Sequence, residues 1–442
     1  MKGMRAGLGM IAALALAAGL GACKANVKLG AEPQASPEQQ AALVAKGHYL
    51  TQAGDCAACH TRPGGEEFAG GRALETPFGK IYAPNITPDK ATGIGAWTRA
   101  DFHRAVHHGQ DDEGQNLYPA FSYPFYAKVK DEDVDAIRAY LNTVPAVSYT
   151  APKNELGFPF NIRLLLKGWN LLHFRSGVWQ DQAGKSAEWN RGAYLVEGLG
   201  HCGACHTPKN LMGGDVKERL LQGGVLEGWF ASDLTGNKKT GLGSWSEQDI
   251  VDFLKTGINS HTSAYGGMAE VVRLSTSKLT DEDLKAMAVY LKSKPASRTQ
   301  PVAAAPRPAQ LTAGKAVYDK NCADCHVPDG SGIPSLFPAL AANANVNAHT
   351  PASVIQIILT GTGSAENPSP GGTGMTAFPK LTNKEVADVA TYVRGSFGNK
   401  APAVTEREVA RVRAEVNRRN PVAAAPASAP AAAPAPEAPA AK

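Results

Sequence analysis

The segment Cys56-Ala57-Ala58-Cys59-His60 decides the fold of this chain, and it returns as Cys202-Gly203-Ala204-Cys205-His206 and as Cys322-Ala323-Asp324-Cys325-His326. In Cys-x-x-Cys-His, two thiols about one helical turn apart can add to the vinyl groups of a haem, and the next imidazole can bind the iron. A redox dithiol, half of a zinc site or a disulfide would explain one copy. None of these alternatives requires a His after the second Cys in every copy, so the repeats predict three covalently bound c-type haems.

The three motifs also assign the residues that hold each haem. The expected attachment thiols are those of Cys56, Cys59, Cys202, Cys205, Cys322 and Cys325. The expected iron ligands are His60, His206 and His326. A neutral imidazole binds iron through one ring nitrogen, and we expect a neighbouring acceptor to hold the other.

The seventh cysteine, Cys23, lies outside the motifs. It follows Lys2, Arg5 and an uncharged run over residues 6–22, which is short for a membrane span and typical of a secretory signal. Leu20-Gly21-Ala22-Cys23 resembles a bacterial lipobox, in which the Cys is lipidated and becomes the mature N-terminus. Ordinary cleavage nearby and an uncleaved anchor are the alternatives. We therefore expect a protein on the periplasmic side of the cytoplasmic membrane, lipid-anchored at Cys23.

Each motif is followed by a closing helix with the same pattern. The segments at 131–141, 281–291 and 383–393 share an acidic first turn, apolar residues three and four apart and a Tyr near the end. Before each motif comes a helix that contains a glycine, at Gly47, Gly192 and Gly314. In a small cytochrome fold the leading and closing helices cross closely, and glycine permits that approach because it has no side chain.

The first two units are related by duplication. Thr92-Gly93-Ile94-Gly95-Ala96-Trp97 and Thr240-Gly241-Leu242-Gly243-Ser244-Trp245 lie 148 positions apart, and the shorter third unit has no such insert. The predicted fold is therefore mainly α, with three tandem class I cytochrome c domains. The expected segments are a lipoprotein-type signal peptide (1–22), a tether (23–37), domain 1 (38–150), an apolar interdomain segment (151–185), domain 2 (186–295), a Pro/Ala linker (296–310), domain 3 (311–398) and a charged stretch with a disordered Pro/Ala tail (399–442).

Methionine supplies the expected second axial ligand in two units. Met268, in a glycine-containing loop ahead of the second closing helix, and Met375, the one Met of the third unit, are the predicted iron ligands. Met212 follows His206 too closely, and Met287 lies inside the closing helix on a core period. A thioether on the iron raises the reduction potential of a cytochrome.

Unit one has no methionine between His60 and its closing helix. The 148-residue offset aligns Met268 with Ala120, which is followed by Phe121. Three arrangements stay open: a second His ligand, a ligand from elsewhere, or a five-coordinate iron. We favour bis-His ligation, with the candidates His103, His107 and His108.

Charge and composition limit the classes of partner that this chain can bind. The formal charge of +5 is modest and no Lys/Arg run forms a phosphate-binding stripe, so we expect no nucleic acid. Residues 158–179 are apolar and aromatic, and two interpretations of them are equally open: packing across the domain joint, or a surface that meets a partner subunit or the membrane.

The motif order, the two Thr-Gly-x-Gly-x-Trp inserts, Leu117-Tyr118-Pro119-Ala120-Phe121 and Gly267-Met268-Ala269-Glu270-Val271-Val272 resemble the triple-haem cytochrome c subunit of bacterial membrane-bound dehydrogenases. The resemblance covers residues 37–397. It implies electron transfer from a dehydrogenase catalytic subunit, of quinoprotein, flavoprotein or molybdenum type, to ubiquinone or a terminal oxidase at the membrane surface. In many relatives the first loop carries Met where Phe121 stands, so this chain departs from the family pattern at the first haem. No catalytic residue is expected, and the alternative is a peroxidase-like protein that uses an open site at the first haem.

Overall fold

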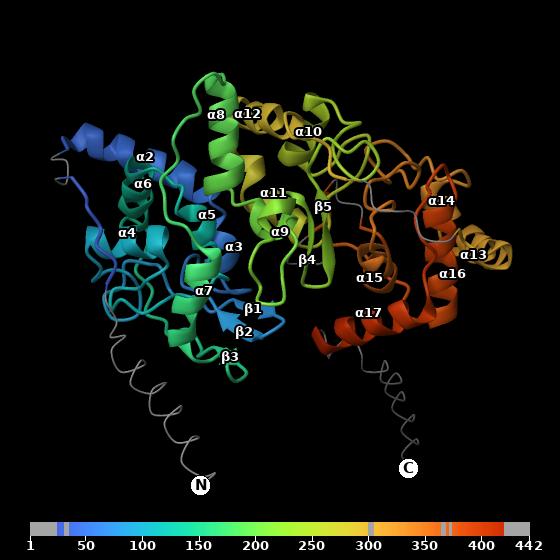
Figure 1. The fold of residues 1–442 in the computed structure, drawn as a ribbon, viewed down its shortest axis with the longest axis horizontal. Coiled ribbons are helices and arrows are strands. Elements are labelled where there is room, and N and C mark those ends of the chain that lie inside the picture. The colour runs from blue at the N-terminus through green and yellow to red at the C-terminus, as the bar shows by residue number, and fades with distance from the viewer. Residues whose placement is uncertain (1–23, 31–34, 299–304, 364–367, 371–373, 420–442) are drawn as a thin grey trace, which may run out of the picture.

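The computed structural model describes residues 24–30, 35–298, 305–363, 368–370 and 374–419 (Figure 1). Cys23, the rest of the expected leader and the tail beyond residue 419 lie outside these ranges. Helices far outnumber the short strands, so the prediction of a mainly helical fold is confirmed. Within the described ranges no helix has the length and apolar character needed to cross a bilayer.

Unit one is built on a pair of crossed helices with the first Cys-x-x-Cys-His segment at the end of the leading one. Ser36 caps this leading helix in a capping box with Gln39, so the helix begins earlier than its apolar period alone indicates. The elements of this unit are α2 (Pro37–Ala53), α3 (Cys56–His60), β1 (Ala73–Thr76), β2 (Gly79–Tyr82), α4 (Arg99–His108), α5 (Tyr123–Tyr126) and the closing helix α6 (Asp131–Leu141).

The described part of the expected tether lies against unit one. The backbone N–H of Ala25 donates to Oε1 of Gln110 at 2.8 Å, and Nε of Arg104 donates to the Ala25 carbonyl at 3.3 Å. Residues 24–30 thus run along α4 without regular secondary structure. The chain is held to the domain before α2 begins.

The segment between units one and two contains β3 (Glu155–Leu156), the 3-10 turn η1 (Arg163–Leu165) and α7 (Leu166–His173). β3 adds to the antiparallel β1-β2 hairpin of unit one. Trp169 and Phe174 pack edge-on against Tyr123, while the side chains of Leu171 and Leu172 stay 74% and 61% exposed. The segment therefore packs on unit one with one face and presents an apolar face to the outside with the other.

Unit two repeats the plan of unit one. A π-helical turn, η2, is inserted between the leading helix and the second motif. The elements are α8 (Ala187–Tyr194), η2 (Leu195–Leu199), α9 (Gly203–His206), η3 (Lys217–Arg219), β4 (Gln222–Leu226), β5 (Trp229–Asp233), α10 (Glu247–Thr256), α11 (Gly267–Leu274), η4 (Thr276–Lys278) and the closing helix α12 (Asp281–Lys292).

Unit three is shorter and carries an extra helix after its closing helix. That helix, α17, packs Val409 and Val412 into the core beneath α15 and α16 (Figure 1). The expected charged stretch over residues 406–419 is thus a helix that belongs to the third unit. The elements are α13 (Pro308–Asn321), α14 (Ala323–His326), α15 (Ala352–Thr360), the closing helix α16 (Asn383–Gly395) and α17 (Glu406–Arg419).

The three helix crossings share one close backbone contact. A Cβ on Gly47 in α2 would lie 1.8 Å from the carbonyl oxygen of Ala136 in α6. The equivalent distances at Gly192 and Gly314 are 1.9 and 2.1 Å to a backbone oxygen of the closing helix. Any side chain would overlap that oxygen, so the expected role of these glycines is confirmed.

Units one and two share one continuous hydrophobic core, whereas unit three has its own. Their contact is reciprocal. The Tyr49 hydroxyl of unit one donates to Oδ2 of Asp283 in α12 at 2.6 Å, and the Tyr194 hydroxyl of unit two donates to Oδ2 of Asp133 in α6 at 2.5 Å. The two tyrosines follow equivalent glycines and the two aspartates occupy equivalent positions, so the duplicated units meet as the halves of a symmetric dimer do.

Candidate functional site

The three Cys-x-x-Cys-His motifs lie on or immediately before the short helices α3, α9 and α14, each directly after a leading helix. The residues before the first cysteine turn the chain sharply in the first two units. Asp55 and His201 have φ of 52° and 38°, in the left-handed region that non-glycine residues rarely adopt. This turn separates the motif helix from the leading helix and sets the two thiols on a new helical turn.

All three motif histidines make the same hydrogen bond. In each, Nδ1 lies within hydrogen-bond distance of a backbone carbonyl oxygen, so Nδ1 carries the proton and Nε2 is left to bind a metal. The three contacts join His60 to Pro84 at 2.8 Å, His206 to Ser232 at 2.7 Å and His326 to Pro338 at 3.1 Å. Burial lowers the pKa of each of these imidazoles, which favours the neutral form that binds iron.

The motif thiols are half-buried, except that of Cys325, which is exposed. Burial raises the pKa of Cys59 to about 12, with smaller contributions from the charges of Asp55 and Cys205. Burial likewise raises the pKa of Cys56 and Cys202 to about 12.

A half-buried cation beside the first motif is also suited to a haem. Arg62 stacks over the ring of Tyr149 at 3.9 Å, and within the part of the chain that the structure describes its Nη1 is buried without a hydrogen-bond partner. Haem carries propionate groups, and guanidinium groups pair well with carboxylates. With the oriented imidazoles and the paired thiols, this unpaired donor makes the residues present a good fit to covalent haem.

The structure places the two predicted methionine ligands in different settings. Met268 is the second residue of α11 and packs half-buried against the shared core. Met375 lies in an irregular segment, where its N–H donates to Oγ1 of Thr362 at 2.8 Å and its carbonyl accepts from the Thr362 N–H at 3.0 Å. Met287 is 3% exposed and belongs to the core, as its place in the closing helix indicates, and Met212 is 50% exposed.

In unit one an aromatic cluster occupies the corresponding loop. The ring of Phe121 packs 5.3 Å from that of Tyr126, whose hydroxyl donates to the Gly54 carbonyl at 2.7 Å. Tyr126 in turn lies 5.1 Å from the ring of His201, directly before the second motif. The loop that carries a thioether in unit two is therefore closed by packed rings in unit one.

The histidines favoured as the sixth ligand in unit one have other partners. Nε2 of His103 bonds Oδ1 of Asp135 at 2.9 Å, and Nε2 of His107 bonds the Val129 carbonyl at 2.8 Å. His108 is half-buried at the end of α4, and burial lowers its pKa. Ligation by His103 or His107 through Nε2 would require these bonds to break, so the structure lends no contact in support of bis-His ligation.

Sequence reasoning missed the carbonyl groups that orient the three imidazoles. Pro84 and Ser232 are 148 positions apart, the offset that relates Thr92 to Thr240. The duplication therefore contained a signal that these two positions are equivalent. A backbone carbonyl imposes no residue type, so nothing in the residues themselves marked its role.

Comparison with known proteins places these sites in context. The family model described as cytochrome c matches residues 44–145 and 311–396. The gluconate 2-dehydrogenase cytochrome c subunit of Pantoea cypripedii is 43% identical over 396 residues, which cover 84% of this chain and 90% of that protein. The cytochrome c subunit of the quinone alcohol dehydrogenase of Gluconacetobacter polyoxogenes is 38% identical over 404 residues, or 86% of each chain. The fructose dehydrogenase cytochrome subunit of Gluconobacter japonicus is 38% identical over 401 residues, covering 84% of this chain and 82% of that protein.

Proposed function

Because the chain belongs to the cytochrome c family, among the cytochrome c subunits of dehydrogenases, we propose that it is the triple-haem electron-transfer subunit of a dehydrogenase complex. Family membership implies covalently bound haem c, and each haem iron supplies reversible one-electron uptake and release. The donor is a catalytic subunit of quinoprotein, flavoprotein or molybdenum type. The acceptor is ubiquinone or a terminal oxidase.

The observation that carries the proposal is the hydrogen bond from an imidazole Nδ1 to a backbone carbonyl, present in all three units. It fixes the tautomer and the ring orientation, and it raises the basicity of Nε2 as a ligand. The paired cysteines would hold the edge of the haem through two thioether bonds. Together these residues support one redox centre per unit.

The joint between units one and two supports transfer between their centres. The two units share a core, and paired charges such as Arg72 with Glu270, at 2.5 and 2.7 Å, bind them together. A rigid joint keeps the distance between redox centres constant. Unit three is joined to unit two by polar contacts, among them the Phe230 N–H with the Ser353 hydroxyl at 2.8 Å.

Counting the haems tests the proposal directly. The full chain, made in a bacterial periplasm competent for haem attachment, should carry three porphyrins by intact mass and by the reduced pyridine spectrum. The double variants Cys56→Ala/Cys59→Ala and Cys322→Ala/Cys325→Ala should each carry two. A wild-type protein with fewer than three covalent porphyrins would contradict the proposal.

Membrane anchoring needs its own experiment. We propose that the lipid on Cys23 holds the chain to the periplasmic face of the membrane, with a second contact from the partner subunit, because one lipid chain binds a bilayer only marginally. Cys23→Ser should move the protein to the soluble periplasmic fraction while it keeps three haems. Retention of Cys23→Ser in membranes freed of the dehydrogenase would refute the anchor.

A second candidate function rests on the missing thioether of unit one. Because Phe121 stands beside the position equivalent to Met268, an open first haem would suit a peroxidase-like activity. Carbon monoxide and cyanide distinguish the two functions. In a relay, all three irons should be largely low-spin before any ligand is added, and carbon monoxide or cyanide should leave their spectra unchanged. The relay should also accept electrons from a copurified dehydrogenase on addition of its substrate, and should not consume peroxide.

A further inference from the structure

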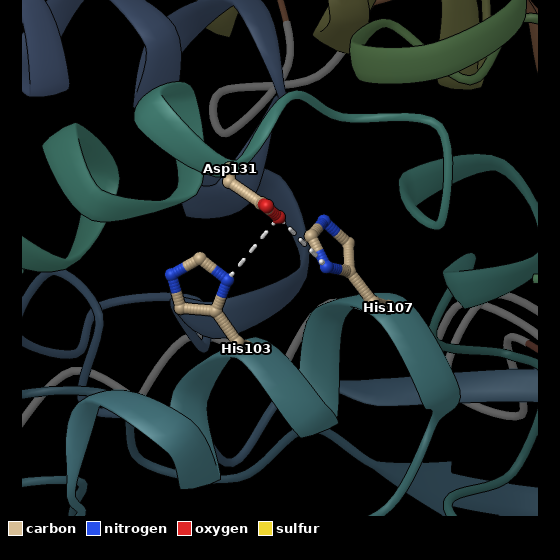
Figure 2. A group of neighbouring side chains, drawn as sticks. All are labelled: His103, His107 and Asp131. Carbon is tan, nitrogen blue, oxygen red and sulfur yellow. Dashed lines mark ion pairs between the residues drawn. The ribbon is translucent and has the colours of Figure 1, made fainter. Parts of the chain in front are cut away.

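A second cluster of ligand-type side chains lies in unit one, apart from the Cys-x-x-Cys-His motifs. His103 and His107 stand one turn apart on α4, and Asp131 is the first residue of α6. Figure 2 shows both imidazoles directed toward the Asp131 carboxylate. Over the ranges that the structure describes, these three side chains form the one group of His, Cys, Asp or Glu residues whose ligand atoms all lie within 4.8 Å of one another.

The distances within this cluster suit a metal better than a hydrogen bond. Nδ1 of His103 and Nδ1 of His107 lie 3.7 and 3.6 Å from Oδ1 of Asp131. Both separations exceed the range of an N–H···O hydrogen bond. Two ligands at the usual bond lengths of about 2.0–2.1 Å from a tetrahedral zinc ion lie about 3.4 Å apart. The two imidazole nitrogens lie within 4.8 Å of each other. A contraction of a few tenths of an ångström in the two His–Asp pairs, and of at most about 1.4 Å between the imidazoles, would bring all three groups onto one ion.

The nitrogen directed into the cluster has no other partner. His103 is 0% exposed, and its Nδ1 is buried without a hydrogen bond to any of the described residues. A buried polar atom of this kind is costly and marks a position where a ligand is expected. The unpaired Nδ1 of His103 is therefore an independent sign that the cluster binds an ion.

The remaining nitrogens of the two rings are fixed as in metal-binding histidines. Nε2 of His103 meets the carboxylate of Asp135, itself held by Arg99 through bonds of 2.6 Å. Nε2 of His107 meets the backbone carbonyl of Val129. A histidine that binds a metal usually bonds a carboxylate or carbonyl through its other nitrogen, which orients the ring.

In unit two, an ion pair joins the two equivalent helices without a metal. At the positions equivalent to His103 and His107, unit two has Val251 and Lys255. There Nζ of Lys255 pairs directly with Oδ1 of Asp281, the equivalent of Asp131, at 3.1 Å. An ammonium group thus joins the two helices of unit two, whereas unit one presents two imidazoles to the same carboxylate.

We propose that unit one binds one divalent transition-metal ion of borderline softness, of which zinc is the representative, through Nδ1 of His103, Nδ1 of His107 and a carboxylate oxygen of Asp131. The side chain of Asp131 is 50% exposed, so water can occupy the fourth position. The ion fastens α4 to α6 in the place of the ammonium of unit two. The inference is independent of the electron-transfer proposal.

Zinc chloride added to the full-length protein with its haems attached tests the site. Bound metal ions are first removed with a chelator, and the protein is desalted, mixed with zinc and desalted again. Elemental mass spectrometry then gives the zinc and the iron content per chain. We expect one retained zinc per chain beside the irons, and a higher melting temperature with zinc than without it. A stripped wild-type chain that retains no zinc overturns the proposal.

Three variants make the result specific. His103→Val/His107→Lys copies the residues of unit two and should lose the zinc and the zinc-dependent rise in melting temperature, while it still folds. Asp135→Asn should weaken binding about 10- to 100-fold, because it removes the negative charge of the carboxylate that His103 bonds through Nε2. His261→Gln, in unit two beside Asp249, should retain one zinc. Equal zinc binding by the double variant, or a change in the axial ligation of the first haem on loss of His107, would overturn the assignment.

Discussion

At the scale of the residue, the three units differ in what they place at or beside the predicted position of the second axial ligand. Unit two offers Met268 at the start of α11, unit three offers Met375 in a loop tied to Thr362, and unit one offers the packed rings of Phe121 and Tyr126. A sulfur ligand raises the potential of a haem, so we predict unequal potentials for the three centres. The lowest potential is expected at the centre without sulfur.

Replacement of Met268 tests the assignment in unit two. Met268→Ala should remove the sulfur-to-iron charge-transfer band of one haem and lower the reduction potential of that haem, because the axial thioether is lost. The measurement is a spectroscopic redox titration of the oxidised protein. Met212→Ala is the matched control, since Met212 is 50% exposed, and its titration should overlay that of the wild type. An unchanged band in Met268→Ala would exclude this ligand.

Arg394 is a buried cation whose removal should be costly. It is 0% exposed in α16, and it donates to the carbonyl oxygens of Val346 and Ala348, both at 2.9 Å. Burial lowers the pKa of Arg394 to about 10, so it stays charged at neutral pH. Arg394→Met should lower the free energy of unfolding by about 3 kcal/mol, because buried carbonyls lose a charged donor. Denaturant titration measures the change, and exposed Arg407→Met should alter stability by less than about 0.5 kcal/mol.

At the scale of the element, the fold depends on three helix crossings without room for a side chain. The crossing sets the angle between leading and closing helices, and hence the position of the motif that follows the leading helix. Gly47, Gly192 and Gly314 each face a backbone oxygen at a distance that a Cβ cannot tolerate. The crossing therefore positions the haem residues in every unit.

Gly47→Ala should lower the free energy of unfolding far more than the same substitution at a glycine with open space around it. The added methyl would lie 1.8 Å from the Ala136 oxygen, so α2 and α6 must separate, with an expected loss of more than about 3 kcal/mol and incomplete haem attachment in unit one. Haem content and denaturant unfolding measure both effects. Gly168→Ala on α7 is the control, because no atom lies within 4 Å of the position that its methyl group would take, and it should be neutral or stabilising by up to about 1 kcal/mol.

Much of this element structure follows from the sequence. The predicted closing helices at 131–141, 281–291 and 383–393 are confirmed within two residues at each end, since acidic first turns and apolar periodicity are local signals. A capping box is present at Thr382, whereas Asp283 bonds to Tyr49 and Arg191 and does not complete a box at Thr280. That exchange depends on a contact 234 positions away in the chain, which local spacing cannot reveal. The burial of α17 was missed for the same reason.

Some of the residues expected around the haems can be identified from the sequence, whereas others depend on tertiary packing. The Cys-x-x-Cys-His motifs are contiguous, so the sequence identifies them as candidates without a fold. The carbonyl partners of the imidazoles lie 24, 26 and 12 positions further along, on loops placed by tertiary packing. The grouping of His103 and His107 with Asp131 also depends on how α4 and α6 pack, and helical spacing alone shows only that the two imidazoles share a face.

At the scale of the whole molecule, units one and two form a single body through their reciprocal tyrosine–aspartate bonds. Tyr49→Phe should lower the free energy of unfolding by about 1.5–3 kcal/mol, because it removes a hydrogen bond to a carboxylate at a partly buried site. Tyr194→Phe should cost a similar amount by symmetry. Tyr82→Phe, which removes an exposed bond to Glu155, is the control and should cost less than about 0.5 kcal/mol. Costs no larger than that of the control would contradict a stabilising role for the reciprocal bonds.

The same joint should respond to acid. Although burial opposes ionisation, hydrogen bonds from Arg191 and Tyr49 hold the pKa of Asp283 below its ordinary value. A carboxyl whose pKa is lowered on folding contributes stability above its unfolded pKa of about 3.9, and this contribution is lost as pH falls toward the folded pKa. The free energy of unfolding should therefore fall more steeply below about pH 4 in the wild type than in Asp283→Asn. Parallel curves for the two proteins would exclude Asp283 as a source of the acid response.

The reciprocal bonds have a consequence for any shorter form of the chain. Unit one carries Tyr49 and Asp133, and unit two carries the equivalent Tyr194 and Asp283. Each unit alone therefore has both the hydroxyl donor and the carboxylate acceptor that form the joint. Two copies of one unit can form the same two tyrosine–aspartate hydrogen bonds with each other that units one and two form here. A fragment with a single half should accordingly behave as a homodimer in solution, which is the arrangement expected of an ancestor before its gene was doubled and fused.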